Sequence, residues 1–451
     1  MRGINHPRYD TYCMVAPILY GRLYFDLQKI GNAPLFNLVA MTNEYDFIII
    51  GGGPAGMLAA GRAGERGKKV ILLEKKESVG KKLLLCASGR CNVTNTAPFS
   101  TFFNAYEKAG HFMRPSLGAF SNENLRSFLS SYGVETIEES KGRVYPMSQQ
   151  AESVRDALQS YLDTQRITVR KNSRVLRVKE ENKQVAGVET KDGFIRGRNV
   201  LIATGGLSYP STGSTGDGYE FAISLGHTIC KTYPAIIAFE TEEIWVKQVQ
   251  GTPIKNVQIT AFQKGNKIAQ HFGEALFTHY GISGPAILSI SKRIMEKFDM
   301  GAIRIHIDFK PNVALHDLDA QLVKQINSNG GKAIKTCLTY FVPEKLSPLL
   351  LSTCGIDEKK KASQITAKER KKILDQLKGL SLTISSPRPI EEAIITGGGV
   401  ELNEVESRTM ESKLIKGLYF AGEVLDIDGP TGGFNLQAAF STGYLAGNSI
   451  Q

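Results

Sequence analysis

The sequence lacks long apolar runs and has few cysteines. No stretch reaches the roughly 18 uninterrupted apolar residues that a membrane-spanning helix needs, so we expect no membrane partner. Six cysteines at irregular spacings do not suggest a disulfide scaffold and favour reduced thiols in the cytoplasm. The seven histidines form neither an HxxxH nor an HExxH pattern, so we expect no metal centre.

The first forty residues also lack hydrophobic periodicity, and prolines interrupt them. Charged residues break their apolar part and no cleavage site follows, so they do not form a secretory signal. Met41 then begins a stretch that is typical of the start of a nucleotide-binding domain. We therefore expect residues 1–40 to be an N-terminal extension without a role in function.

Positive charge is in excess, at a net +11, and can attract nucleic acid or a multiply charged cofactor. The densest basic stretch is KKKASQITAKERKK, Lys359 to Lys372. It has no interleaved aromatic residues and is typical of a solvated helix. We therefore do not expect nucleic acid as a partner, although association with RNA remains an alternative.

The stretch YDFIIIGGGPAGMLAAGRAGERGKKVILLEKK is the most informative part of the chain. Phe47–Ile50 and Val70–Leu73 are short apolar runs typical of buried parallel strands, and helix formers fill Ala55–Arg66 between them. The pattern therefore predicts a strand, a glycine turn, a helix and a second strand.

The glycines of this turn are spaced as Gly51-x-Gly53-x-x-Gly56. The first allows the tight turn, the second lets the backbone approach a pyrophosphate, and the third lets the helix pack on the strand. Glu74 follows the second strand, where a carboxylate accepts both ribose hydroxyls. An acid at this position favours FAD or NAD over NADP.

Two later strand ends also carry glycines. Val200–Ala203 leads into Thr204-Gly205-Gly206, and Leu418–Ala421 leads into Gly422-Glu423 and a glycine-rich loop before the last helix. Because the carboxyl ends of parallel strands share one edge of a sheet, these turns can converge with the first one. The last helix can then place its N-terminus at the N1/C2=O edge of a flavin, and Glu423 can bind ribityl hydroxyls.

Seven motifs occur in one order: GGGPAG, GRCNVTN, GRVYPMSQQA, ATGGLSYPSTGSTGDGYEFA, GEALFTHYGISGPAIL, ITGGGVELNEV and LYFAGEVLDIDGPTGGFNLQAAFSTGYLAG. With them, the chain from about Met41 resembles the YhiN/BaiN-like flavoproteins, also called the aminoacetone oxidase-like family. The resemblance implies a discontinuous Rossmann-like FAD-binding domain with an inserted β-rich cap and a helical segment. We assign 41–234 and 385–451 to the FAD-binding domain, 235–311 to the cap and 312–384 to the helical segment.

The resemblance also implies the residues that bind FAD. Val175 is matched to the backbone contact with adenine, and Gly89 to Asn92 are matched to a loop that passes the flavin. The chain is also more distantly similar to fumarate reductases, but it lacks their proton-donating arginine, because Thr431 stands in its place. The full expected set is Gly51, Gly53, Pro54, Ala55, Gly56, Glu74, Lys75, Gly89, Arg90, Cys91, Asn92, Val175, Thr204, Gly205, Gly206, Gly422, Glu423, Gly432, Gly433, Phe434, Asn435 and Leu436.

These features predict an FAD-dependent oxidoreductase whose small organic substrate lies between flavin and cap. It is either an NAD(P)H-linked reductase or an amine oxidase that uses oxygen. No second strand-GxGxxG-helix pattern occurs, so a nicotinamide would reach the flavin only transiently. His279 is the candidate acid–base residue, with a structural role as its alternative, and Arg143 and Tyr145 are candidates for binding an anionic substrate.

A disulfide reductase is the remaining alternative. Cys86 and Cys91 have the spacing of a redox-active disulfide beside a flavin. Such reductases also need an NAD(P)H domain and a C-terminal histidine, whereas the last histidine here is His316. The resembled family moreover usually has serine at the position of Cys86. We therefore expect the two cysteines to belong to a flavin-contacting loop.

Overall fold

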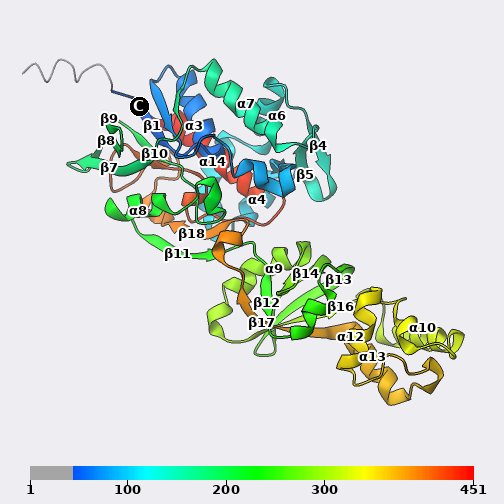
Figure 1. The fold of residues 1–451 in the computed structure, drawn as a ribbon. Helices are drawn as coiled ribbons and strands as arrows, with labels where there is room; N and C mark the ends of the chain where they lie inside the picture. The colour runs from blue at the N-terminus through cyan, green and yellow to red at the C-terminus, as the bar shows by residue number, and fades with distance from the viewer. Residues whose placement is uncertain (1–43) are drawn as a thin grey trace, which may run out of the picture. The chain divides into compact units, whose positions relative to one another are not determined.

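The computed structural model describes residues 44–451, so the predicted extension lies outside the described residues. A five-stranded parallel sheet in the order β19-β10-β1-β2-β6 is the core of the first domain (Figure 1). Every residue of β1, β2, β10 and β19 is buried, which explains their uninterrupted apolar sequences. These four match the predicted strands to within one residue. The five strands are β1 (Phe47–Ile50), β2 (Val70–Leu73), β6 (Thr168–Arg170), β10 (Val200–Ile202) and β19 (Leu418–Phe420).

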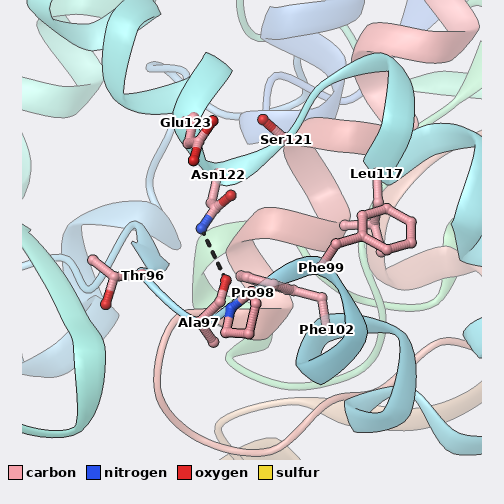
Figure 2. A pocket seen from close by; sticks show the side chains of 9 residues that line it. All are labelled: Thr96, Ala97, Pro98, Phe99, Phe102, Leu117, Ser121, Asn122 and Glu123. Carbon is pink, nitrogen blue, oxygen red and sulfur yellow. Dashed lines mark hydrogen bonds between the residues drawn. The ribbon is translucent and has the colours of Figure 1, made fainter.

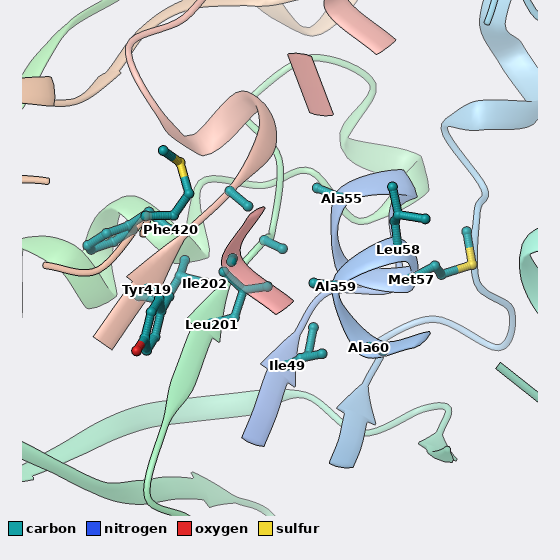
Figure 3. Packing of buried hydrophobic residues seen from close by; sticks show 14 of the residues in the cluster. Ile49, Ala55, Met57, Leu58, Ala59, Ala60, Leu201, Ile202, Tyr419 and Phe420 are labelled. Carbon is teal, nitrogen blue, oxygen red and sulfur yellow. The ribbon is translucent and has the colours of Figure 1, made fainter. Parts of the chain in front are cut away.

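Two helices from opposite ends of the chain pack together beside this sheet (Figure 1). They are α3 (Pro54–Glu65) and α14 (Phe434–Ser449). A Cβ atom at Gly443 or Gly447 would lie 2.3 Å from a backbone carbonyl oxygen of α3, so only glycine permits this approach. Figure 3 shows side chains of α3 in the same apolar core as those of β1, β10 and β19. The predicted discontinuous Rossmann-like domain is therefore confirmed.

Further helices and two small antiparallel sheets complete this domain. The sheets have the strand orders β3-β5-β4 and β7-β8-β9. The helices are α4 (Phe99–Ala105), α5 (Gly110–Ala119), α6 (Asn122–Ser131), α7 (Ala151–Thr164) and α8 (Asp217–Ser224). The strands are β3 (Thr94–Asn95), β4 (Thr136–Glu139), β5 (Arg143–Pro146), β7 (Val175–Glu181), β8 (Gln184–Thr190) and β9 (Gly193–Arg196).

The inserted β-rich part is a closed barrel with the strand order β12-β15-β14-β13-β16-β17. Burial alternates along β16, as expected for a strand with one face in a core. A two-stranded ribbon of β11 and β18 connects the barrel to the first domain. The elements are β11 (Ile229–Pro234), β12 (Phe239–Thr241), β13 (Pro253–Gln263), β14 (Asn266–Phe277), β15 (Gly281–Ser283), α9 (Pro285–Met295), β16 (Ile303–Asp308), β17 (Leu380–Pro387) and β18 (Thr396–Val400).

The helical segment is inserted within the barrel, between β16 and β17. It contains α10 (Leu315–Ser328), α11 (Ile334–Leu338), α12 (Ser347–Thr353) and α13 (Ala367–Gly379), and its apolar side chains belong to one cluster with those of the barrel. Two sequence expectations differ from this arrangement. The segment predicted to end at residue 384 ends at Gly379, because β17 pairs with β16 and closes the barrel. The predicted basic helix begins only at Ala367, where Thr366 accepts a hydrogen bond from the Glu369 backbone at 3.2 Å and caps α13.

None of the helices within residues 44–451 combines the length and the apolar character needed to cross a membrane.

Candidate active site

A cavity of about 620 Å³ lies at the carboxyl edge of the parallel sheet. The glycine turns after β1, β10 and β19 all contribute to its wall, as the positions of these strands predict. The volume falls within the range of about 300–1,000 Å³ that is usual for small-molecule sites. Of the predicted residues, those that line it are Gly51, Gly53, Pro54, Ala55, Glu74, Lys75, Arg90, Asn92, Arg143, Tyr145, Val175, Thr204, Gly205, Gly422, Glu423, Gly432, Gly433, Asn435 and Leu436.

The turn after β1 exposes backbone to the cavity. Gly51 has φ +106°, and a Cβ atom at Gly56 would lie 2.0 Å from the Gly51 carbonyl oxygen. Gly53 is the N-cap of α3 and has no protein atom within 4 Å of the position of a Cβ. The first turn of α3 therefore points its N–H groups and its partial positive charge into open space, an arrangement that fits a pyrophosphate.

Buried polar groups line the part of the cavity at the end of β2. Glu74 is 8% exposed, and its carboxylate accepts hydrogen bonds from the backbone N–H groups of Gly52 and Lys76, both at 2.8 Å. The hydroxyls of Ser173 and Thr204 are buried without a partner among the described residues, although both residues line the cavity. Unpaired buried hydroxyls are costly, so these groups fit a ligand with many hydrogen-bonding atoms, such as a dinucleotide.

The C-terminal part of the wall is fixed by a network around Glu423. Its carboxylate receives hydrogen bonds from the Lys82 ammonium at 2.6 Å, the Ser208 hydroxyl at 3.0 Å and the Thr396 backbone at 2.8 Å. Gly433 is the N-cap of α14 with φ +98°, and a Cβ there would lie 2.1 Å from the Thr94 carbonyl oxygen. The N-terminus of α14 is thus held against the cavity, and its position at the N1/C2=O edge of a flavin stays a prediction.

Strand β5 contributes two of the predicted substrate-binding residues. Arg143 and Tyr145 both line the cavity, since alternate residues of a strand share a face. Arg90 lies 4.1 Å from the centre of the Tyr145 ring and forms an ion pair with Glu139. Within residues 44–451, no carboxylate pairs with Arg143. Its positive charge is therefore available to a ligand.

Six predicted residues do not line the cavity. His279 lies between β14 and β15, with its ring centre 4.9 Å from that of Tyr280, so its acid–base role stays a prediction. Phe434 packs on Phe102, and its carbonyl accepts a hydrogen bond from Tyr106. The others are Gly56, Gly89, Cys91 and Gly206.

Sequence reasoning missed an apolar wall that comes from the barrel and its connecting ribbon. Its residues are Ile236, Pro285, Leu288, Ile394 and Ile395. They reach the cavity only because the pairing of β11 with β18 brings residues far apart in the chain together. Two of the sequence motifs include part of this wall, one ending at Leu288 and one beginning at Ile395, but neither revealed which side chains face a ligand.

An ion pair connects barrel helix α9 to the glycine-rich loop before α14. The Lys292 ammonium lies 3.0 Å from the carboxylate of Asp428, which is 7% exposed. Burial raises the pKa of Asp428, and Lys292 opposes this effect. The pair therefore stabilises the ionised form of a buried acid at the edge of the cavity.

We expect Lys292→Met to make the protein unstable at high pH. The pKa of an aspartate in the unfolded chain is about 3.9. An acid whose pKa is higher in the folded protein stabilises the fold at pH values below its unfolded pKa. This stabilisation is lost as the pH rises through the folded pKa. Without Lys292 the folded pKa of Asp428 rises further, and an unpaired buried charge costs about 3–5 kcal/mol. Thermal unfolding at about pH 5 and about pH 8 measures the effect.

The double variant Lys292→Met/Asp428→Asn is the control, because it removes the buried charge together with its partner. It should show the weaker pH dependence of the unmodified protein. If Lys292→Met alone unfolds with the same pH dependence as the unmodified protein, the pair does not stabilise the ionised form.

A second, smaller cavity of about 350 Å³ lies at the N-terminus of α6 (Figure 2). Phe99, Phe102 and Leu117 form its apolar side. The Asn122 side chain donates a hydrogen bond to the Ala97 carbonyl at 3.2 Å, so part of its polar side is already paired.

Comparison with known proteins supports a flavoprotein site. The sequence profile of a family described as "HI0933-like protein Rossmann domain" matches residues 45–449. The chain is 33% identical over 408 residues to a 3-dehydro-bile acid delta(4,6)-reductase of Clostridium scindens, covering 89% of this chain and 98% of that protein. It is 29% identical over 411 residues to a ribosomal RNA dihydrouridine synthase of Escherichia coli, covering 90% and 98%.

A solved structure shares the fold. It is a 3-ketosteroid-delta4-(5alpha)-dehydrogenase from Rhodococcus jostii in complex with 4-androstene-3,17-dione, which matches with a TM-score of 0.50 at 14% identity. The match covers 91% of this chain and 97% of that chain.

Proposed function

This chain belongs to the HI0933-like family of FAD-binding Rossmann proteins, and we propose that it reduces a carbon–carbon double bond conjugated to a carbonyl group in a small apolar substrate. The protein is an FAD-dependent oxidoreductase, and FAD is its cofactor. We further propose that the substrate lies between the cofactor and the barrel. We also propose NADH or NADPH as the electron donor, and a cytoplasmic location because the five described cysteines are unpaired thiols.

The observation that carries the proposal is that the cavity has two different walls. Cofactor-binding turns form one wall, whereas isoleucine, leucine and proline side chains from the barrel side form the other. Ile394 is 40% exposed and Leu85 is 45% exposed in the structure, and both line this cavity. A flat apolar molecule between the two walls would bury them.

The polar end of the cavity supports a substrate with a carbonyl or an anionic group. Arg143 has no ion pair among the described residues, and Tyr145 beside it has a hydroxyl that can donate a hydrogen bond. Burial lowers the pKa of His271 on β14, and the charges of Lys141 and Arg143 lower it further. Arg143 therefore contributes a positive charge to this side of the cavity.

The chemistry follows from these positions. When bound, FAD supplies two-electron hydride chemistry. Tyr145 would donate a hydrogen bond to the carbonyl oxygen and stabilise the negative charge that develops on it as the conjugated double bond is reduced, whereas Arg143 would bind an anionic group of the substrate. The apolar wall would orient the carbon skeleton and exclude water. Arg90, fixed by Glu139 and stacked on Tyr145, would keep the tyrosine ring in place.

The proposal is tested with three matched compounds under anaerobic turnover. A 3-oxo-4-ene steroid acid, its saturated ketone and a primary amine of similar size are each offered with NADH and with NADPH. We expect nicotinamide oxidation only with the conjugated ketone. Turnover of the amine in the presence of oxygen, with none of the ketone, would instead identify an amine oxidase.

We expect Arg143→Gln to raise the KM for an acidic substrate by about 10–100-fold, the equivalent of about 1.4–2.7 kcal/mol. The cause is loss of a charge-assisted hydrogen bond. The KM for the corresponding neutral amide should change much less, and FAD content should be unchanged. Steady-state kinetics with the acid and the amide measure the difference. An equal rise for both compounds would show that Arg143 does not bind the anionic group.

A second candidate substrate is uridine within RNA, which also contains a double bond conjugated to a carbonyl group. Exposed lysines without an ion pair in the described part of the helical segment favour it; they are Lys359, Lys361, Lys368 and Lys371. Incubation of the reduced protein with ribosomal RNA, followed by measurement of dihydrouridine, tests this candidate. RNA retention that does not weaken with salt would argue against an electrostatic surface here.

A further inference from the structure

Two thiols meet at the wall of the main cavity. Cys86 lines the cavity, whereas Cys91 is fully buried behind it. The Cys91 backbone N–H donates a hydrogen bond to the Cys86 carbonyl at 3.0 Å, and each thiol shifts the pKa of the other. The loop therefore folds back on itself and brings the two cysteines close together.

The two thiols have different protonation behaviour. The hydrogen bond from the Cys91 thiol lowers the pKa of Cys86, and a backbone hydrogen bond from Asn92 and the charge of Lys82 act in the same direction. The same thiol–thiol hydrogen bond and burial raise the pKa of Cys91. A thiol with a lowered pKa at the cavity and a thiol with a raised pKa behind it correspond to the attacking and the resolving thiol of a disulfide-exchange site.

The backbone between the thiols is strained. Ala87 and Ser88 have φ of +50° and +57°, and Cys91 has φ +61°. Residues without glycine's freedom adopt this region at a cost of order 1 kcal/mol or more each. Because no glycine relieves these three positions, the surrounding structure must hold this turn in the conformation that brings the two cysteines close together.

We propose that Cys86 and Cys91 form a reversible intramolecular disulfide by exchange with a small-molecule disulfide. The Cys86 thiolate attacks one sulfur of the small disulfide, so that a mixed disulfide forms and one thiolate leaves. The Cys91 thiol then gives its proton to that thiolate or to water, attacks the Cys86 sulfur and releases the second small thiol. Two protein thiols are oxidised, and one small disulfide is reduced to two thiols.

This activity is separate from the proposed reduction of a conjugated double bond. It requires neither Arg143 nor the apolar wall from the barrel. A failure of either proposal therefore leaves the other unaffected.

The experiment uses the FAD-loaded full-length protein and bis(2-hydroxyethyl) disulfide, a small neutral probe. After incubation, acid quenching and alkylation, the peptide that contains Cys86 and Cys91 is analysed by mass spectrometry. We expect it to lose two hydrogens and to escape alkylation, and to regain both alkylation sites after treatment with a thiol reductant. Absorbance of bound FAD confirms that each sample remains folded.

Single variants separate the two roles. Cys91→Ser should accumulate a mixed disulfide of the probe on Cys86, because the resolving thiol is missing, whereas Cys86→Ser should leave Cys91 unmodified. Cys230→Ser is the matched control: Cys230 is also partly exposed, but burial raises its pKa to about 12, so it should react slowly. Full alkylation of both cysteines in the FAD-loaded protein after the same exposure, or no adduct in Cys91→Ser, overturns the proposal.

Discussion

Gly53→Val will give a folded protein that purifies without FAD. The residue has φ −79° and ψ 179°, which valine adopts readily, and no protein atom lies within 4 Å of the added Cβ. The side chain would instead occupy the space where the backbone approaches the pyrophosphate. We expect FAD affinity to fall at least about 100-fold, the equivalent of about 2.7 kcal/mol. Flavin absorbance per protein and titration of the apoprotein with FAD measure it.

Two other glycines provide the controls for this variant. Gly118→Ala also meets nothing within 4 Å but lies in α5, away from the cavity, so it should keep FAD. Gly56→Ala places its Cβ 2.0 Å from a backbone oxygen and should impair folding itself. A yellow Gly53→Val protein with unchanged FAD affinity would show that the pyrophosphate does not lie at this turn.

Ile394→Trp will keep FAD and lose turnover. Ile394 lies on the apolar wall opposite the cofactor-binding turns and is 40% exposed, so a larger side chain can extend into the cavity without disturbing a core. It should occupy the space that we assign to the substrate. We expect kcat/KM to fall about 100-fold or more, the equivalent of about 2.7 kcal/mol of transition-state stabilisation.

The matched control for this variant is Ile244→Trp. Ile244 is 79% exposed on the barrel and does not line the cavity. It should retain full activity and full FAD content. If Ile394→Trp is as active as the control, the substrate does not lie between the cofactor and the barrel.

Local sequence signals predicted the parallel sheet and its glycine turns well. Phe47–Ile50 and Val70–Leu73 are apolar along their whole length because both faces of the sheet are covered, and this leaves a clear pattern in the sequence. The spacing of Gly51, Gly53 and Gly56 predicts a tight turn, because it depends only on the backbone geometry of a few neighbouring residues. Such features require no knowledge of the rest of the fold.

The features that the sequence did not predict all depend on contacts between distant residues. Strand β17 closes the barrel after more than sixty residues of inserted helices, and its pairing with β16 leaves no local signal. Ile236 and Ile394 line the cavity because their backbones are hydrogen-bonded to each other beside the β11–β18 ribbon. The position of Cys86 relative to Cys91 is a local exception, because it depends on the turn between them.

The measurement that tests the central claim most directly is an anaerobic titration of the fully reduced, FAD-loaded protein. A 3-oxo-4-ene steroid acid is added in increments while flavin absorbance is followed, and the product is identified by mass spectrometry and NMR. We predict that one equivalent returns the flavin to its oxidised spectrum and that the product is the saturated ketone with its carbonyl intact. Flavin that stays reduced with this compound and with other conjugated ketones, but is oxidised on admission of oxygen, would contradict the account.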